Sequence, residues 1–182
     1  MKKNMDISKF YHYAFPAQAV IVTCDDKDGK TNPITIAWHC PISKKPPLYG
    51  ISVGPGRYSH DLIEKNKEFV INFAPYKLVE KVNYCGTKSG RNTDKIKKIG
   101  LTLSESEKIK TKYIKECYAH MECKLFASKA LGDHSFFVGE VVNILADKDA
   151  FTSDLLDNER IKPLYYLGDN FYTTVADDKL RI

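Results

Sequence analysis

Short apolar runs separated by polar turns recur along the chain and predict a domain built mainly from β-strands. Residues 19–24 form a nearly continuous apolar run, and a turn rich in Asp and Gly separates it from a second strand that starts at Asn32. This arrangement predicts a β-hairpin. Residues 68–74 place Phe69, Ile71 and Phe73 on one face and end at Pro75, which predicts a further strand.

The final third of the chain has the longest strand patterns. Residues 116–128 and 135–146 alternate apolar and polar side chains, which predicts an antiparallel pair of long strands such as a barrel uses. The aromatic-rich tail at residues 163–172 predicts another hairpin. Short helices are predicted at residues 6–15, 59–66, 77–86 and 94–99, with Gly86 as the C-terminal cap of the third.

Residues 32–61 carry the strongest functional signal. Alternation predicts one strand over residues 34–40 with two different faces: Ile34, Ile36, Trp38 and Cys40 on one, and Thr35, Ala37 and His39 on the other. The face of small and polar side chains leaves room for a flat molecule to lie against the backbone. The alternative, that Thr35 and His39 simply face water, stays open.

The next strand, residues 48–53, leads into a glycine turn and a helix start. Ser59 is a good N-cap, and Asp61 suits the positive end of the helix dipole. Arg57 is placed to bind a phosphate at this helix end, although a capped surface helix with a solvated Arg57 is also compatible. Residues 87–95 form a second candidate anion-binding loop, with a plain solvated connection as the alternative.

Composition limits the class of protein. The chain has 182 residues, 43% hydrophobic and 28% charged, which predicts a single domain over residues 1–182 with a sizeable core. A net charge of +5 favours phosphate-bearing ligands, but no arginine-rich stripe or zinc-finger spacing indicates nucleic-acid binding. No apolar run is long enough for a signal segment or a membrane span, so we expect a cytoplasmic protein without a membrane partner.

Five cysteines, an odd number spread over the chain, suit a reducing compartment. Cys117, His120 and Cys123 suggest a zinc site, but an offset of three along a strand turns His120 away from both thiols, so no metal is predicted. Cys40 and Cys85 are interpreted as buried, inert thiols. The chain has no GxGxxG, Walker, GxSxG or HExxH motif, which argues against a Rossmann site and against hydrolysis.

An ordered set of short motifs gives the chain a family resemblance. These are Asn32-Pro33-Ile34-Thr35-Ile36-Ala37-Trp38, Pro46-Pro47, Arg57-Tyr58-Ser59, Cys85-Gly86, Ser89-Gly90, Asp94-Lys95 and Gly132-Asp133-His134. The set resembles the flavin reductase-like family of FMN-binding split barrels, and within it the flavoredoxin-type branch. The resemblance covers residues 19–172.

The resemblance implies a mainly β, α+β fold, an FMN-binding split β-barrel that works as a homodimer with noncovalent FMN near the subunit interface. It also assigns roles to residues of this sequence. Asn32, Thr35, Ala37 and Trp38 would line the isoalloxazine, and Arg57, Ser59, Ser89 and Lys95 would lie near the phosphate or the reduced flavin. His134 would be the catalytic-site residue beside the open face of the flavin, where a nicotinamide docks. Leu167 stands where an aromatic cover would be expected.

The resemblance therefore implies an oxidoreductase. NAD(P)H or a protein donor would reduce FMN, and a flavin, a ferric ion or a protein would accept the electrons. Hydride transfer to flavin N5 needs orientation and desolvation rather than a general base, which agrees with the missing catalytic motifs. The alternatives are a non-catalytic FMN-binding electron carrier and a ligand-binding module. An enzyme like pyridoxamine-phosphate oxidase fits the order of motifs less well.

Overall fold

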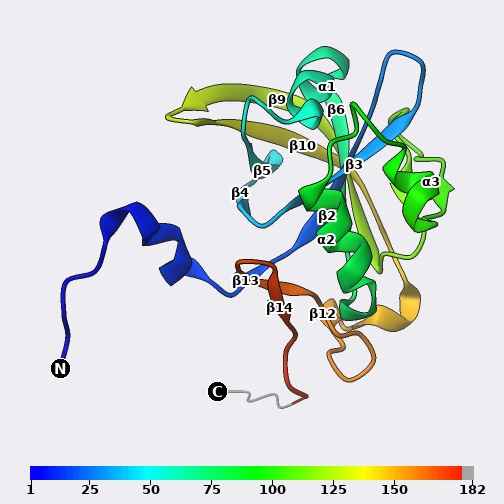
Figure 1. Cartoon of the computed structure of the whole chain (residues 1–182). Coiled ribbons are helices and arrows are strands. Elements are labelled where there is room, and N and C mark those ends of the chain that lie inside the picture. The colour runs from blue at the N-terminus through cyan, green and yellow to red at the C-terminus, as the bar shows by residue number, and fades with distance from the viewer. Residues whose placement is uncertain (178–182) are drawn as a thin grey trace.

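A seven-stranded antiparallel sheet organises the computed structural model, which describes residues 1–177 (Figure 1). Its strand order is β3-β2-β6-β9-β10-β5-β4. The bounds are β2 (Val20–Asp25), β3 (Thr31–Ile36), β4 (His39–Lys44), β5 (Pro47–Val53), β6 (Glu68–Phe73), β9 (Ala119–Leu131) and β10 (His134–Ala146). The predicted hairpin is β2–β3, and the predicted long pair is β9–β10, which projects from the body as an extended hairpin.

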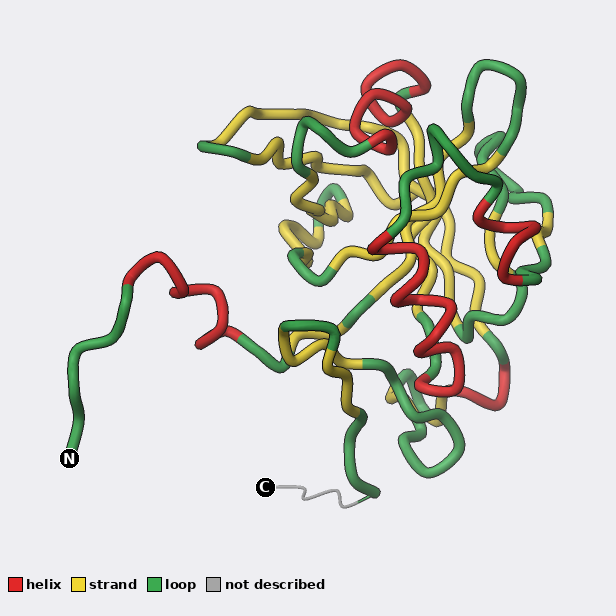
Figure 2. Tube along the Cα trace, viewed as in Figure 1, coloured by secondary structure: helices red, strands yellow, loops and turns green. Residues whose placement is uncertain are grey.

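Smaller elements surround this sheet (Figure 2). Three small sheets are formed by β1 (Ala17–Gln18) with β13 (Tyr165–Gly168) and β14 (Phe171–Thr173), by β7 (Leu103–Ser104) with β8 (Tyr113–Ile114), and by β11 (Phe151–Thr152) with β12 (Leu155–Leu156). The helices are α1 (Tyr58–Asn66), α2 (Val79–Thr87) and α3 (Lys95–Ile99), with 3-10 helices at Ile7–Ala14, Tyr76–Leu78 and Lys148–Ala150.

Strand β2 separates two apolar cores, which explains its unbroken run of apolar residues. Val20 and Val22 pack in a core with Phe69 of β6 and with α1, whereas Ile21 faces a second core that contains Val82 of α2. All four side chains from Ala19 to Val22 are fully buried. A strand buried on both faces loses the period-two pattern that marks a half-exposed strand.

The prediction of a single strand over residues 34–40 is wrong. β3 ends at Ile36, the chain turns at Ala37 and Trp38, and β4 starts at His39. Because β3 and β4 form opposite edges of the sheet, this turn carries the chain from one edge to the other. His39 consequently leaves the face of Thr35 and hydrogen-bonds through its ring nitrogens to the Tyr49 hydroxyl (2.7 Å) and the Gln18 carbonyl (2.9 Å).

Two predicted helix ends are also wrong. α1 begins at Tyr58, so Arg57 and not Ser59 occupies the N-cap position, although Asp61 does lie in the first turn. α2 continues through Gly86 to Thr87. Gly86 is needed for a different reason: a Cβ there would lie 3.2 Å from Cβ of Thr35, so the glycine lets the helix pack closely on β3.

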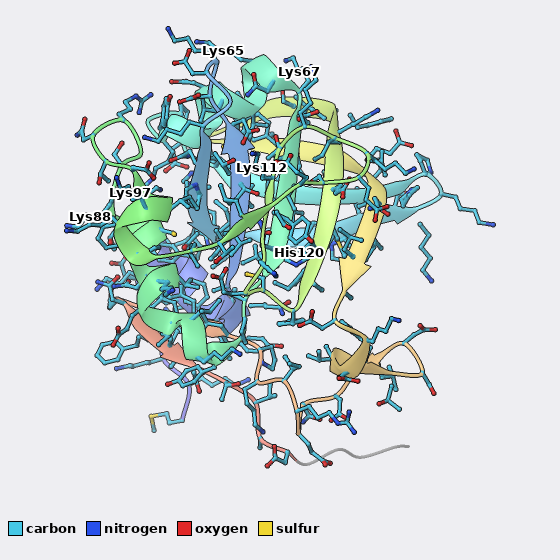
Figure 3. All side chains as sticks on the ribbon, turned by 90° about the vertical axis from the view of Figure 1, so that its right-hand side faces the viewer. Lys65, Lys67, Lys88, Lys97, Lys112 and His120 are labelled. Carbon is cyan, nitrogen blue, oxygen red and sulfur yellow. The ribbon has the colours of Figure 1, made fainter. Side chains whose placement is uncertain are left out.

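Lysines are scattered over the surface rather than gathered in a stripe. Figure 3 shows Lys65, Lys88 and Lys97 pointing outward, whereas His120 lies among the strands. His120 is buried, and its Nδ1 lies 3.0 Å from Oδ1 of Asn72. Burial lowers the pKa of His120 to about 4, so the ring is neutral at physiological pH. Residues 1–177 contain no group of three or more His, Cys, Asp or Glu side chains arranged to hold a metal ion.

Candidate flavin site

Two adjoining pockets lie beside β3. The wide pocket has a volume of about 500 Å³ and the narrow pocket about 70 Å³. Ile34, Arg57 and Gly86 line both, so the two pockets adjoin at these residues, and we call them together the hollow. The shape suits a ligand with a bulky ring at one end and a small group at the other.

All the predicted site residues lie around this hollow. Those in the wide pocket are Thr35, Ala37, Trp38, Arg57 and His134. Those in the narrow pocket are Asn32, Arg57, Ser59, Ser89 and Lys95. Residues from β3, from the turn before α1, from the loop after α2 and from the β9–β10 tip thus converge although they are far apart in sequence. Their roles toward a ligand stay predictions.

The floor of the wide pocket is formed by small side chains of β3 and α2. The Thr35 hydroxyl donates to the Val82 carbonyl of α2, so this group ties the helix to the strand instead of pointing freely into the pocket. Close packing of Gly86 on Thr35 keeps the floor flat. At Thr35 and Gly86 the small groups leave room for a planar ring.

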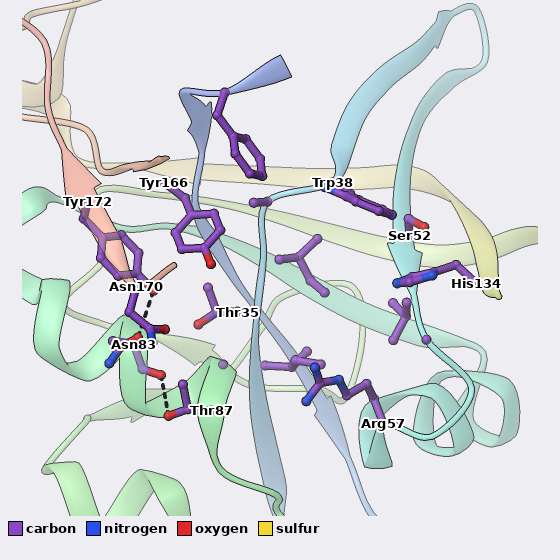
Figure 4. A pocket seen from close by; sticks show the side chains of 17 residues that line it. Thr35, Trp38, Ser52, Arg57, Asn83, Thr87, His134, Tyr166, Asn170 and Tyr172 are labelled. Atoms are coloured by element: carbon purple, nitrogen blue, oxygen red, sulfur yellow. Dashed lines mark hydrogen bonds between the residues drawn. The ribbon is translucent and has the colours of Figure 1, made fainter. Parts of the chain in front are cut away.

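One wall of the wide pocket is formed by Trp38 and His134 (Figure 4). Their ring centroids are 5.0 Å apart. His134 Nδ1 lies 2.8 Å from Oδ1 of Asp133, and this contact lowers the pKa of the Asp133 carboxyl group. Since the carboxylate accepts, Nδ1 carries the proton, and Nε2 lies beside Gly54. Asp133 thereby fixes both the ring orientation and the tautomer of His134.

The opposite wall is aromatic and was missed by sequence reasoning. Figure 4 shows Tyr166 and Tyr172 of the C-terminal hairpin facing the pocket. Their ring centroids are 5.2 Å apart. The Tyr172 hydroxyl donates to Oδ1 of Asn83 on α2 (3.3 Å). The sequence placed Leu167 where an aromatic cover would be expected. In the structure Leu167 is exposed, and its neighbour Tyr166 supplies the aromatic surface. The aromatic tail was the signal that could have found it. Other lining residues that were missed include Phe15, Ser52, Thr87 and Asn170.

The narrow pocket has an unusual donor set. Lys95 is only 4% exposed, and its ammonium group donates to the carbonyls of Cys85 (3.0 Å) and Lys88 (3.3 Å) at the end of α2. Burial lowers the pKa of Lys95, and the nearby Arg57 acts in the same direction. Within residues 1–177 neither cation has a carboxylate partner. A buried ammonium group without a counter-ion, with the exposed guanidinium of Arg57 at the same small pocket, favours a bound anion.

Asn32 and Ser59 form the inner wall of the narrow pocket. The Asn32 side chain donates from Nδ2 to Oγ of Ser59 (2.7 Å), and both residues are buried. Ser59 therefore joins α1 to β3 instead of capping its helix. The Ser59 side chain also interacts with the Cys24 thiol. Asn32 and Ser59 therefore form a polar inner wall beside the two cations.

Comparison with known proteins identifies the family. A family model described as the flavin reductase like domain matches residues 12–174. The chain belongs to this flavin reductase-like family. A protein of Archaeoglobus fulgidus is 34% identical over 173 residues, covering 94% of this chain and 96% of that protein.

Two solved structures extend the comparison. Flavoredoxin of Desulfovibrio vulgaris (Miyazaki F) is 25% identical with a TM-score of 0.89, covering 100% of this chain and 97% of that one. An FMN-binding protein from Thermus thermophilus, with bound 1-cyclohex-2-enone, is 26% identical with a TM-score of 0.84, covering 100% and 98%. These similarities confirm the predicted split β-barrel and support flavin binding by this member of the flavin reductase-like family.

The remaining sequence-based expectations concern thiols and membranes. Cys85 is buried, as predicted, and burial raises the pKa of its thiol to about 12. Cys40 is exposed on β4, which corrects the expectation that it is buried. In the part of the chain that the structure describes, no helix has the length and hydropathy needed to cross a bilayer.

Proposed function

We propose that this protein is an FMN-dependent oxidoreductase that takes electrons from NAD(P)H, or from a protein donor, and passes them to a flavin, a ferric ion or a protein acceptor. The observation that carries the proposal is the buried Lys95 and the exposed Arg57, which have no carboxylate partner within residues 1–177. Both lie at the narrow end of a hollow whose wide pocket is lined by aromatic rings. Bound FMN would supply the redox chemistry, as a hydride acceptor and an electron donor.

The chain's own residues would bind and orient the cofactor. Arg57, Ser59, Ser89 and Lys95 surround the space that suits the phosphate, at the N-terminal end of α1, where free backbone amides also favour an anion. Thr35, Ala37 and Trp38 line the space that suits the tricyclic ring, and the Asn32 amide lies between ring and phosphate. The chemistry of the residues on these two parts of the hollow supports the assignment to FMN.

His134 is proposed as the residue beside the reacting face. Its ring hydrogen-bonds to Asp133 and packs against Trp38, and the His134 side chain is one-third exposed. From this position it would help to orient a nicotinamide and to exclude water from the face of the flavin, a positioning role that requires no proton transfer.

Anaerobic mixing of the FMN-loaded protein with NADH or NADPH tests the reductase. We expect the flavin absorbance to bleach within the time of turnover, and we expect His134→Ala to slow the bleaching while FMN stays bound. Bleaching by neither nucleotide at full FMN occupancy would contradict the reductase. It would favour the electron carrier, the function suggested by the similarity to flavoredoxin. A protein that takes up no FMN would favour the ligand-binding module.

A homodimer is part of the same proposal. The N-terminal 3-10 helix buries none of its residues, and Figure 1 shows it projecting from the body, with Ile7 and Phe10 exposed by 86% and 65%. A mostly apolar groove of about 660 Å³, lined by residues that include Tyr118, Met121 and Ile144, opens elsewhere on the surface. Exposed apolar area of this kind favours association with a second copy.

Light scattering during size-exclusion chromatography measures the assembly. We expect twice the 20.7 kDa mass of one chain. Replacing both Ile7 and Phe10 by Ser should shift the equilibrium toward the monomer, because it removes apolar surface that a partner would cover. A wild-type protein that stays monomeric at micromolar concentration would refute the dimer.

A further inference from the structure

The Trp38 side chain forms its wall of the wide pocket through contacts with other rings. The chain turns at Trp38 between β3 and β4, and the Trp38 carbonyl accepts the backbone amide of Ser52 (2.9 Å). This hydrogen bond holds the backbone but leaves the side-chain torsions free. The indole contacts two rings, with centroid distances of 5.0 Å to His134 and 5.7 Å to Tyr11. The orientation of this wall therefore depends on Tyr11 as well as on His134.

Tyr11 belongs to the N-terminal 3-10 helix, whose two sides differ in exposure. Ile7, Phe10 and Tyr13 are exposed, whereas Tyr11 and His12 are half-buried. The outward side is the apolar surface that the proposed homodimer would cover. The inward side, which includes Tyr11, faces the body of its own chain and brings an N-terminal side chain to the wall of the wide pocket.

The same segment is anchored on the opposite wall of the pocket. Phe15 lines the wide pocket, and its ring centroid lies 5.3 Å from that of Tyr166. A Cβ at Gly168 would lie 3.2 Å from Nδ1 of His12 and 3.6 Å from Cδ2 of Phe15, and the φ of Gly168 is +106°. Glycine at this position therefore lets the N-terminal segment pack directly on the C-terminal hairpin. Pairing of β1 with β13 holds the two segments together just beyond this contact.

Tyr11 and Phe15 connect the two walls. Their ring centroids are 6.3 Å apart. Ring contacts consequently run without a break from His134 and Trp38, through these two residues, to Tyr166. We call Tyr11 and Phe15 the aromatic bridge. Because aromatic pairs prefer particular geometries, each ring restricts the orientation of the next, and the bridge fixes the two walls relative to each other.

We propose that Tyr11 is a positioning residue for the electron donor, which holds the Trp38 ring, and through it His134, at the face where a planar donor ring stacks. This inference rests on the proposed function, since it concerns the donor side of the same hollow. Tyr11 is not among the residues that line either pocket, so its effect must pass through Trp38. A donor that stacks on a wall already fixed in place has less ordering to offset, so the bridge strengthens donor binding.

Acrylamide quenching of tryptophan fluorescence in the flavin-free protein tests the contact itself. Trp38 is the single tryptophan of the chain, so the signal reports this ring alone. Tyr11→Leu removes the aromatic partner but keeps an apolar side chain, and we expect it to raise the quenching constant by about twofold. Tyr11→Phe retains the ring and should behave as wild type. Tyr13→Leu is the matched control, since Tyr13 lies in the same helix and is 62% exposed.

Anaerobic rapid mixing of the FMN-loaded variants with NADH or NADPH tests the consequence for the donor. Tyr11→Leu should raise the donor concentration that gives half the maximal bleaching rate by about threefold to tenfold, the effect of losing one aromatic pair. The limiting rate should change by less than about twofold, because the wall contacts the donor equally before and during the transfer. FMN affinity, measured by titration of the flavin-free protein, should stay within about twofold of wild type.

The possible failures have separate meanings. Unchanged quenching of Trp38 in Tyr11→Leu overturns the inference, and so does an unchanged half-saturating donor concentration. An equal increase in Tyr13→Leu also overturns it, since the effect would then belong to the whole helix. Loss of FMN affinity in Tyr11→Leu would mean that Tyr11 supports the entire hollow, which overturns its specific role toward the donor. Bleaching of the wild-type protein by neither nucleotide would instead overturn the proposed reductase, and with it the donor role of Tyr11.

Discussion

Replacing Lys95 by Met is expected to weaken FMN binding by roughly 1.5 to 3 kcal/mol, the contribution of a hydrogen bond to a charged group. The Lys95 ammonium is buried at the narrow pocket, and its protein acceptors are two carbonyls. A bound phosphate would add a negatively charged partner for this ammonium group, which the two carbonyls do not provide. Met retains the aliphatic part of the side chain, so the loss should come from the charge rather than from packing.

The measurement is a comparison of FMN and riboflavin affinities. Since riboflavin lacks the phosphate, Lys95→Met should reduce FMN affinity and leave riboflavin affinity nearly constant. Lys97→Met, in the same helix α3 but exposed, removes an equal charge and serves as the control. An equal loss for both ligands would show that Lys95 only supports the end of α2 through Cys85 and Lys88. Unchanged FMN binding would remove Lys95 from the site.

The sequence predicted those parts of the fold that depend on local pattern. The β2–β3 hairpin follows from an apolar run and a turn, and the β9–β10 pair follows from two long alternating segments. The break at Ala37 and Trp38 could not be predicted in this way, because the alternation continues across it. It arises from the need to cross between opposite sheet edges, which is a property of the whole topology.

The candidate site also has parts that the sequence predicted and parts that depend on tertiary contacts. Motif order placed all nine predicted residues around one hollow, although no local rule brings Asn32, Ser89 and His134 together. The aromatic wall was missed because Tyr166 and Tyr172 reach the pocket only through the docking of the C-terminal hairpin on the barrel. Ser59 was misassigned because a serine before a helix is usually a cap, and its bond to Asn32 is a tertiary contact.

The burial and the hydrogen-bond partners of polar side chains could not be predicted from the sequence either, and Glu122 is the clearest example. It lies on β9 and is fully buried. Its Oε1 accepts the backbone amide of Glu107 (2.9 Å) and Nδ2 of Asn143 (3.1 Å), and its Oε2 accepts the backbone amide of Lys108 (2.7 Å). The carboxylate thus fixes the loop before β8 on the sheet, and Glu68 holds the same loop through the amides of Lys110 and Thr111.

Glu122→Gln is expected to lower the free energy of unfolding by about 2 to 4 kcal/mol, because every contact of Glu122 is a donor. The amide group of Gln has only one acceptor oxygen, so in either orientation its NH₂ meets a donor and leaves at least one buried amide unpaired. Urea unfolding followed by Trp38 fluorescence measures the change. Glu105→Gln is the matched control in the same loop, since Glu105 is 75% exposed and should contribute little.

The same experiment separates stability from function. Glu122 lines neither the wide nor the narrow pocket, so folded Glu122→Gln protein should bind FMN with wild-type affinity. A variant as stable as wild type would show that the loop is held without the buried charge. A stable variant that lost FMN binding would instead connect this loop to the site, which the hydrogen bonds of the Glu122 carboxylate do not reach, since they go to Glu107, Lys108 and Asn143.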